Sequence, residues 1–215
     1  MTTPLRAILL CVILTPIMAA RVQAQMTDHS IQVSGGYSMH GTGDLPGFVA
    51  EVGYDHVFSK RFDWSNALTT TIHSGKDLLF AYPNSPSPGA DRGLNFTTAG
   101  FQLTSMGHFA PISVRDQKVK LGAGAIFRYQ SSSMPNAYGI YSDPRYFPEP
   151  FYVIYDPEPG NLFTIGYTFG ITWEVRVAPR YAIGLKAMFQ NDTNGDALTS
   201  LSLLFGRLFP PSKTR

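Results

Sequence analysis

In the segment 162–177, eight large apolar side chains, from Phe163 to Val177, occupy every second position, and the positions between them are small or polar. Because successive side chains of a β-strand point to opposite faces, this alternation predicts one strand with an apolar face and a small or polar face. At about 3.3 Å per residue, such a strand exceeds the usual length of about five or six residues. It is long enough to cross a membrane while tilted.

The same period-two pattern recurs along most of the chain. The further segments are residues 31–39, 48–55, 62–73, 94–109, 119–129, 181–190 and 200–209. The segment 94–109 matches the pattern least well, and we expect it to contain a β-bulge. With residues 162–177 the total is eight, an even number, as single-chain bacterial barrels require. The sequence therefore predicts an all-β fold, a single eight-stranded antiparallel up-and-down transmembrane β-barrel.

The connections between these segments differ in length. Short or moderate connections are expected at residues 59–61, 111–116 and 178–180, and longer ones at residues 41–47, 77–93, 131–160 and 191–196. Short periplasmic turns and longer external loops are typical of outer-membrane barrels. Both chain ends then lie on the periplasmic side. The strand positions between the large apolar residues, which we call the polar parity, are rich in Gly, Ser and Thr and poor in charge. This composition favours a membrane barrel, with its apolar face toward lipid, over a soluble barrel.

Aromatic residues gather at both expected ends of the strands. Those near the periplasmic end are Phe58, Phe62, Trp64, Trp173, Tyr181, Phe205 and Phe209. Those near the external end are Tyr37, Phe48, Phe127, Tyr129, Phe163 and Phe189. This distribution predicts the two aromatic girdles of a membrane barrel.

The first residues have the layout of a secretory signal peptide. Arg6 precedes an apolar stretch, residues 7–20, and small residues lead up to Ala24, after which we expect cleavage. The stretch is too short for a comfortable membrane-spanning helix. Cys11 is the only cysteine and lies inside that stretch, so the mature chain has neither a disulfide nor a thiolate metal site. The mature chain is formally neutral, which argues against a nucleic-acid partner.

Eight charged residues fall on the parity expected to face the lumen. They are Glu51, Asp55, Asp63 and Glu174, with Lys120, Arg128, Arg176 and Lys186. The interior of an eight-stranded barrel holds little more than side chains, so these charges must pair or be hydrated. We expect a closed lumen filled by ion pairs, with Glu51 and Arg128 at comparable heights and able to meet. A conducting or proton-relay path is the alternative.

The group His73, Ser74 and Asp77 raises the alternative of a surface lipid-modifying enzyme. A histidine can deprotonate a serine hydroxyl when a carboxylate orients it. Neighbouring residues of a strand point to opposite faces, however, so His73 and Ser74 cannot face each other in a regular strand. We therefore predict no catalytic residue.

A second motif has the spacing of a calcium-binding loop. Asp192, Asn194 and Asp196 occupy its odd positions, but Ala197 replaces the required glycine and no glutamate closes the site. A tight hairpin turn at Asn194 and Gly195 explains the segment better. We expect neither a metal ion nor a cofactor.

The connection 131–160 is the least ordinary part of the chain. It holds six prolines and five tyrosines, which are Tyr138, Tyr141, Tyr146, Tyr152 and Tyr155. It also carries Asp143, Glu149, Asp156 and Glu158 against a single basic residue, Arg145. Long loops are often functional, and exposed tyrosine is favoured at recognition surfaces. We interpret these tyrosines as a candidate binding surface; the alternative is a loop that only covers the barrel mouth.

With its signal peptide, its repeated alternation and its last strand, residues 198–209, the chain resembles the small outer-membrane β-barrel family of Gram-negative bacteria, whose eight-stranded members include OmpA- and OmpX-like domains. The resemblance implies a signal peptide (1–24), a barrel (25–209) and a short tail (210–215). It also implies residence in the outer membrane, contact with its lipid, and recognition of the last strand, ending at Phe209, by the barrel-assembly machinery. The predicted function is a structural or interaction surface formed by external loops, with an external ligand or protein as partner. A lipid-modifying enzyme and a narrow pore for small solutes are the alternatives.

Overall fold

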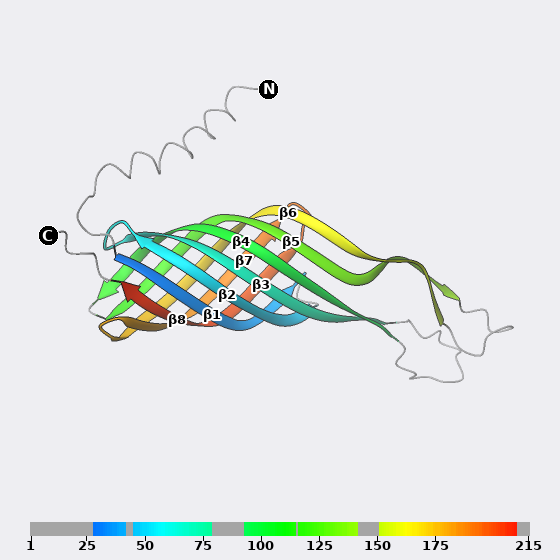
Figure 1. Cartoon of the computed structure of the whole chain (residues 1–215), viewed down its shortest axis with the longest axis horizontal. Helices are drawn as coiled ribbons and strands as arrows, with labels where there is room; N and C mark the ends of the chain where they lie inside the picture. Colours follow the sequence, from blue (N-terminus) through cyan, green and yellow to red (C-terminus); the bar gives the residue numbers. More distant parts are fainter. Residues whose placement is uncertain (1–27, 42–44, 79–92, 115, 142–150, 210–215) are drawn as a thin grey trace, which may run out of the picture.

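A computed structural model describes residues 28–41, 45–78, 93–114, 116–141 and 151–209. It contains eight strands: β1 (Asp28–His40), β2 (Leu45–Val57), β3 (Phe62–Leu78), β4 (Gly93–Val114), β5 (Gln117–Tyr141), β6 (Phe151–Ala178), β7 (Tyr181–Asp192) and β8 (Ala197–Phe209). Each strand pairs with the next in antiparallel fashion, and β8 pairs with β1 to close the barrel (Figure 1). The predicted fold class is confirmed.

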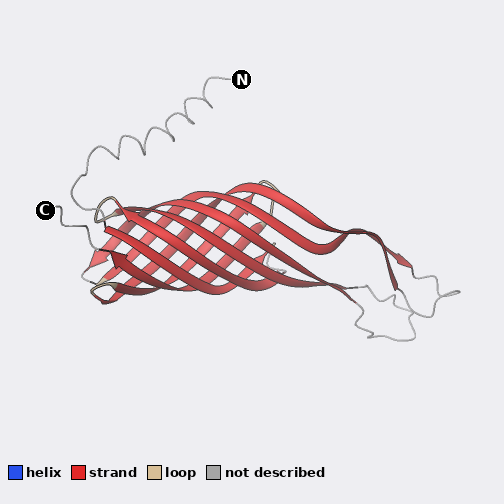
Figure 2. Cartoon of the chain, viewed as in Figure 1, coloured by secondary structure: helices blue, strands red, loops and turns tan. Residues whose placement is uncertain are grey.

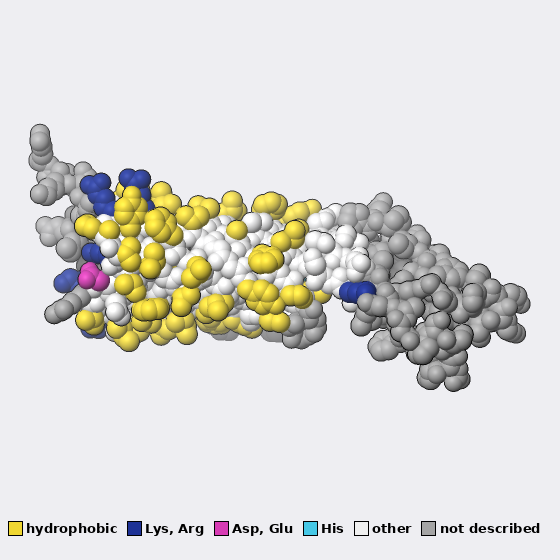
Figure 3. Space-filling model, turned by 90° about the horizontal axis from the view of Figure 1, so that it is seen from below, with side chains coloured by type: hydrophobic (Ala, Val, Ile, Leu, Met, Phe, Trp, Pro, Cys, Tyr) yellow, Lys and Arg dark blue, Asp and Glu magenta, His cyan; other side chains and the backbone are white. Residues whose placement is uncertain are grey.

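The apolar parity of each strand lies on the outside of the barrel. Phe48, Phe163 and Leu203 have exposed fractions of 70%, 65% and 71%, whereas Thr168, on the opposite parity, is fully buried. Figure 3 shows hydrophobic side chains over the outer surface of the barrel. Water would penalise such a surface and lipid would not, so the outside of the barrel is its membrane face. Within the described residues, no helix has the length and apolarity to span a membrane.

Short turns and the described chain ends share one end of the barrel, which we call the periplasmic end. Two residues, 179 and 180, join β6 to β7, and residues 58–61 join β2 to β3. In the second turn the Ser59 hydroxyl accepts hydrogen bonds from the backbone N–H groups of Arg61 and Phe62, at 3.3 and 3.1 Å. Residues 1–27 and 210–215 lie outside the described residues, so the signal peptide, the tail and recognition by the assembly machinery stay predictions.

Strand β4 differs from expectation in where it ends and in where its register shifts. It runs on to Val114, so the connection expected at residues 111–116 is a short turn at residues 115 and 116. The register between β4 and β5 shifts between Phe109 and Ile112, and not within residues 94–109. The irregularity therefore lies at Pro111, where the missing N–H group breaks the hydrogen-bond ladder.

The segment 131–160 is also different from expectation, since much of it is strand. The pairing of β5 with β6 continues outward to Tyr141 and Phe151. By contrast, β4 pairs with β5 only as far as Ser132, and β7 pairs with β6 only as far as Gly166. A two-stranded ribbon, residues 133–141 and 151–160, thus extends beyond the barrel at its external end (Figures 1 and 2).

Candidate functional site

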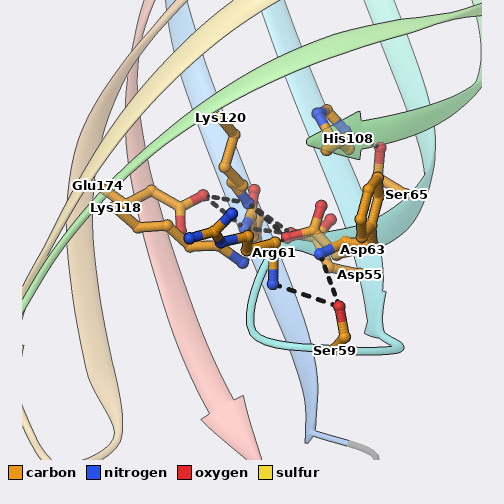
Figure 4. A network of polar contacts seen from close by, with 11 residues as sticks. Asp55, Ser59, Arg61, Asp63, Ser65, His108, Lys118, Lys120 and Glu174 are labelled. Atoms are coloured by element: carbon orange, nitrogen blue, oxygen red, sulfur yellow. Dashed lines mark hydrogen bonds and ion pairs between the residues drawn. The ribbon is translucent and has the colours of Figure 1, made fainter. Parts of the chain in front are cut away.

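The lumen near the periplasmic end contains a buried ionic network centred on Lys120, which we call the inner network (Figure 4). The Nζ atom of Lys120 lies 2.5 Å from Glu174 Oε1 of β6, 3.2 Å from Asp55 Oδ2 of β2 and 3.8 Å from Asp63 Oδ2 of β3. Lys118 Nζ lies 2.7 Å from the same Asp63 oxygen. Charged side chains from four strands thus meet in one place, and the side chain of Lys120 is only 4% exposed. The two ammonium groups offset much of the cost of burying the three carboxylates.

Polar groups and a cavity complete this end of the lumen. Gln32 Nε2 donates hydrogen bonds to Asp55 Oδ2 at 2.6 Å and to Glu174 Oε1 at 3.2 Å. A cavity of about 220 Å³ borders the network and is lined toward the periplasmic end by Lys60, Asp116 and other polar residues. The cavity gives this part of the lumen room for water.

Farther from the periplasmic end, Glu51 of β2 pairs with Lys186 of β7. Lys186 Nζ lies 2.6 Å from Glu51 Oε1, and the Thr69 hydroxyl donates to Glu51 Oε2 at 3.2 Å. The expectation that Glu51 meets Arg128 is therefore wrong. Lys186 reaches Glu51 across the lumen from a strand that is not its neighbour.

Apolar side chains separate this pair from the external end. Met106, Ile126 and Met188 are 1%, 1% and 7% exposed and face the lumen. Along β5, Ile126 lies between Lys120 and Arg128, and along β7, Met188 follows Lys186. Buried apolar side chains therefore form a layer in the middle of the lumen, together with polar ones such as Thr104 and Thr168.

A second polar network, the outer network, lies beyond this layer. Arg128 Nη1 lies 3.7 Å from Asp192 Oδ2, which also accepts a hydrogen bond from the Thr164 hydroxyl at 2.9 Å. Gln130 Nε2 donates to Asp196 Oδ2 at 3.1 Å. The sequence interpretation assigned the two aspartates to a turn and not to the lumen. It did not name Gln130, although Gln130 shares the parity of Arg128 and could have been found by extending the pattern.

A Ser–His contact also lies in this part of the lumen. Ser38 Oγ and His73 Nε2 are 2.9 Å apart, and both side chains are buried. Ser38 and His73 flank Gly47 in the register, and a Cβ at that glycine would lie 2.5 Å from His73 Cδ2. Glycine at this position therefore makes room for the imidazole ring between the two strands. His40 lies beside it, with ring centroids 5.3 Å apart.

This geometry bears on the lipid-modifying alternative. His73 is buried in the lumen, whereas Ser74 is exposed on the other face of β3. The side chain of Asp77 lies outside the described residues. His73 Nδ1 has no hydrogen-bond partner within the described part of the chain, so no described carboxylate orients this ring. His73 and Ser74 therefore lie on opposite faces of β3 and do not form a nucleophile–base pair.

The Asp192–Asp196 segment is the tight turn that its sequence indicates. Asp192 Oδ1 accepts hydrogen bonds from the backbone N–H groups of Asn194 and Asp196, at 3.0 and 3.2 Å. Gly195 has a φ of 81°, a conformation that glycine adopts without strain. Among the described residues, no group of three or more His, Cys, Asp or Glu side chains is placed to hold a metal ion.

The remaining predicted residues fall outside both networks. Arg176 is exposed at the periplasmic end, and its backbone N–H donates to Asp116 O at 2.7 Å. Tyr146 lies outside the described residues, as do the side chains of the other four tyrosines of the segment. The backbone register places Tyr138 opposite Ile154 and Tyr152 opposite Ile140.

Comparison with known proteins identifies the fold. No protein-family model and no curated protein sequence matches the chain. Among solved structures, Ail of Yersinia pestis in complex with the heparin analogue sucrose octasulfate is similar, with a TM-score of 0.54 and 11% identity over 86% of this chain and 100% of that chain. Neisserial surface protein A has a TM-score of 0.52 and 10% identity over 84% and 97% of the two chains. OprG from Pseudomonas aeruginosa has a TM-score of 0.50 and 8% identity over 86% and 97%. With its closed eight-stranded ladder and its apolar outer surface, the chain has the fold of these small, eight-stranded outer-membrane β-barrels.

Proposed function

We propose that this protein is a closed barrel that presents the β5–β6 ribbon outside the membrane as a binding surface for another polypeptide. One observation carries the proposal: within the described residues, the outer parts of β5 and β6 pair only with each other. Unpaired N–H and C=O groups along a strand edge can accept an added strand. The ribbon offers two such edges.

Charge and composition narrow the class of partner. The segment 131–160 carries four acidic residues and one basic residue, together with five tyrosines. Ail was solved with a sulfated sugar, a polyanion. An acidic segment repels such a ligand and attracts a basic one. We therefore favour an extended, basic stretch of polypeptide over a sulfated polysaccharide.

The packed lumen supports the closed-barrel part of the proposal. Arg128, Met106 and Ile126 are among the largest fully buried side chains, and they occupy the middle and external parts of the lumen. An ion would have to displace these side chains and break the Glu51–Lys186 pair. A narrow pore is the second candidate, and the cavity of about 220 Å³ near the periplasmic end favours it.

A binding experiment with two probes tests the proposal. Liposomes that carry the mature protein would be passed over an immobilised peptide of alternating lysine and valine, and separately over immobilised heparin. We expect retention on the peptide and not on heparin. A variant in which residues 134–158 are replaced by a short glycine turn should lose this retention and keep the heat-dependent gel shift of a folded barrel. Retention that survives the replacement, or retention on heparin alone, would contradict the proposed surface.

Conductance of the same liposomes, fused to a planar bilayer, decides between the closed barrel and the pore. The closed barrel gives no steady conductance. Steady single-channel currents from the folded protein would favour the pore.

A further inference from the structure

Three arginine side chains stand out at the periplasmic rim of the barrel. Arg61 lies in the β2–β3 turn, Arg180 in the β6–β7 turn and Arg207 on the lipid-facing parity of β8, and all three are exposed. Within the described part of the chain, none of their guanidinium groups forms an ion pair. Figure 3 shows that Lys and Arg side chains gather at this end of the barrel, beside the apolar surface. Unpaired cations at the edge of a membrane face can attract anionic headgroups of the lipid.

Two of the arginines are neighbours on an aromatic platform. The backbone N–H of Leu208 donates to Arg180 O at 2.8 Å, and Arg207 lies opposite Tyr181 in the β7–β8 register. The rings of Tyr181 and Phe205 stack at 5.7 Å with an interplanar angle of 26°. Arg207 Cζ also lies 5.2 Å from the centroid of the Phe209 ring. The guanidinium of Arg207 thus lies against an aromatic side chain that favours the membrane interface, and Arg180 precedes Tyr181 of the stacked pair.

The charge around this platform is positive. The exposed basic residues described at the periplasmic end are Lys60, Arg61, Arg176, Arg180 and Arg207. The exposed acidic residue described there is Asp116, in the β4–β5 turn, where its carbonyl accepts from the Arg176 N–H. Asp116 lies next to Arg176, and no described acidic side chain forms an ion pair with Arg180 or Arg207.

We propose that Arg180 and Arg207 form a binding site for the headgroup of an anionic phospholipid in the inner leaflet of the outer membrane. Each guanidinium can donate two parallel hydrogen bonds to a phosphate, a geometry that lysine cannot match. The acyl chains then extend from this rim along the exposed face of β7 and β8, over Ile183, Leu185 and Leu203. This site is at the opposite end of the barrel from the β5–β6 ribbon and does not depend on the function proposed for that ribbon.

Tryptophan fluorescence can report on lipid at this site. The chain has two tryptophans, and Trp173 lies opposite Leu185, on the path expected for the acyl chains. A Trp64→Phe background leaves Trp173 as the only tryptophan. The mature protein would be reconstituted in phosphatidylcholine vesicles that contain either brominated phosphatidylglycerol or brominated phosphatidylcholine. Quenching by the bromines measures the relative occupancy of the two lipids beside Trp173.

We expect phosphatidylglycerol to be preferred, by about fivefold for each arginine that contributes about 1 kcal/mol. The Arg180→Gln/Arg207→Gln variant should remove the preference, and Arg180→Lys/Arg207→Lys should keep part of it. High salt should weaken the preference, because the contact is near the surface. Lys76→Gln, a matched loss of charge at the external end, should leave it unchanged.

Three results would overturn the proposal. They are equal quenching by the two lipids in the parent protein, a preference that survives in the double glutamine variant, and a preference that Lys76→Gln removes. The heat-dependent gel shift verifies that each variant is folded. If the double glutamine variant does not fold, the single Arg180→Gln variant in the exposed turn takes its place. Its preference for phosphatidylglycerol should be about fivefold weaker than that of the parent protein.

Discussion

Replacing Lys120 by methionine should strongly destabilise the barrel. Its ammonium group lies between the carboxylates of Asp55, Asp63 and Glu174, and its side chain is 4% exposed. Methionine preserves much of the side-chain volume but leaves three carboxylates with Lys118 as the remaining ammonium in the network. Removing one partner of a buried ion pair typically costs about 3–5 kcal/mol. The network borders a cavity with room for water, so we expect the lower end, about 3 kcal/mol of the free energy of unfolding.

The assay is reversible urea unfolding in lipid vesicles, followed by tryptophan fluorescence. Lys60→Met, which removes an exposed lysine at the same end of the barrel, is the matched control and should change the free energy of unfolding by less than about 0.5 kcal/mol. Adding Asp55→Asn and Glu174→Gln to Lys120→Met should recover most of the lost stability, because it removes the uncompensated charges. A loss below about 1 kcal/mol for Lys120→Met would show that the network behaves like a surface ion pair and would refute this reasoning.

Further substitutions test other parts of the structure. Gly47→Ala should cost about 1–3 kcal/mol in the same unfolding assay, because its Cβ would lie 2.1 Å from a backbone oxygen of β3 and 2.5 Å from the His73 ring. Gly53→Ala, whose nearest neighbour would be 3.5 Å away, should cost less than about 1 kcal/mol, and equal losses for the two glycines would contradict the close approach at Gly47. Leu203→Arg, at the centre of β8, should cost about 2–4 kcal/mol in vesicles, whereas Phe209→Arg at the rim should cost about 0–1 kcal/mol. No difference between these two arginine variants would contradict the assigned membrane face.

The barrel could be predicted from the sequence because apolar side chains that face lipid alternate along each strand with small or polar side chains that face the lumen. From residue 163 to residue 177 the alternation is unbroken, and the structure places its apolar parity outside. Strand β4 is less clear because Ser105 and Gly107 lie on the lipid-facing parity while Met106 faces the lumen. Ser105 is tolerated there since its hydroxyl accepts a hydrogen bond from Trp64 Nε1 at 3.1 Å, a contact between strands that no local pattern shows.

The pairing of charges across the lumen could not be predicted in the same way. Parity indicates which face a residue occupies, but strand tilt and stagger around the closed barrel decide which residues share a height. Glu51 therefore meets Lys186, and Arg128 meets Asp192, although the sequence suggested Glu51 and Arg128. A difference of a few residues in stagger is enough to exchange these partners.

The ribbon of β5 and β6 could not be predicted from the sequence because of its prolines. Pro135, Pro157 and Pro159 interrupt the expected strand pattern, and the register between β5 and β6 shifts on both sides of Pro135. Proline removes a ladder donor, so it normally argues against a central strand. In a two-stranded ribbon every strand is an edge strand, and the missing donors can point away from the partner.

A scan of spin labels along β6 tests the central claim most directly. Residues 25–215 contain no cysteine, so single cysteines can be placed at each position from 163 to 173 in that part of the chain and labelled after reconstitution in vesicles. We predict that collisions with oxygen alternate with period two, high at Phe163, Phe169 and Ile171 and low at Thr164 and Thr168. Accessibility without this alternation, or alternation of the opposite phase, would contradict a closed barrel with its apolar parity toward lipid.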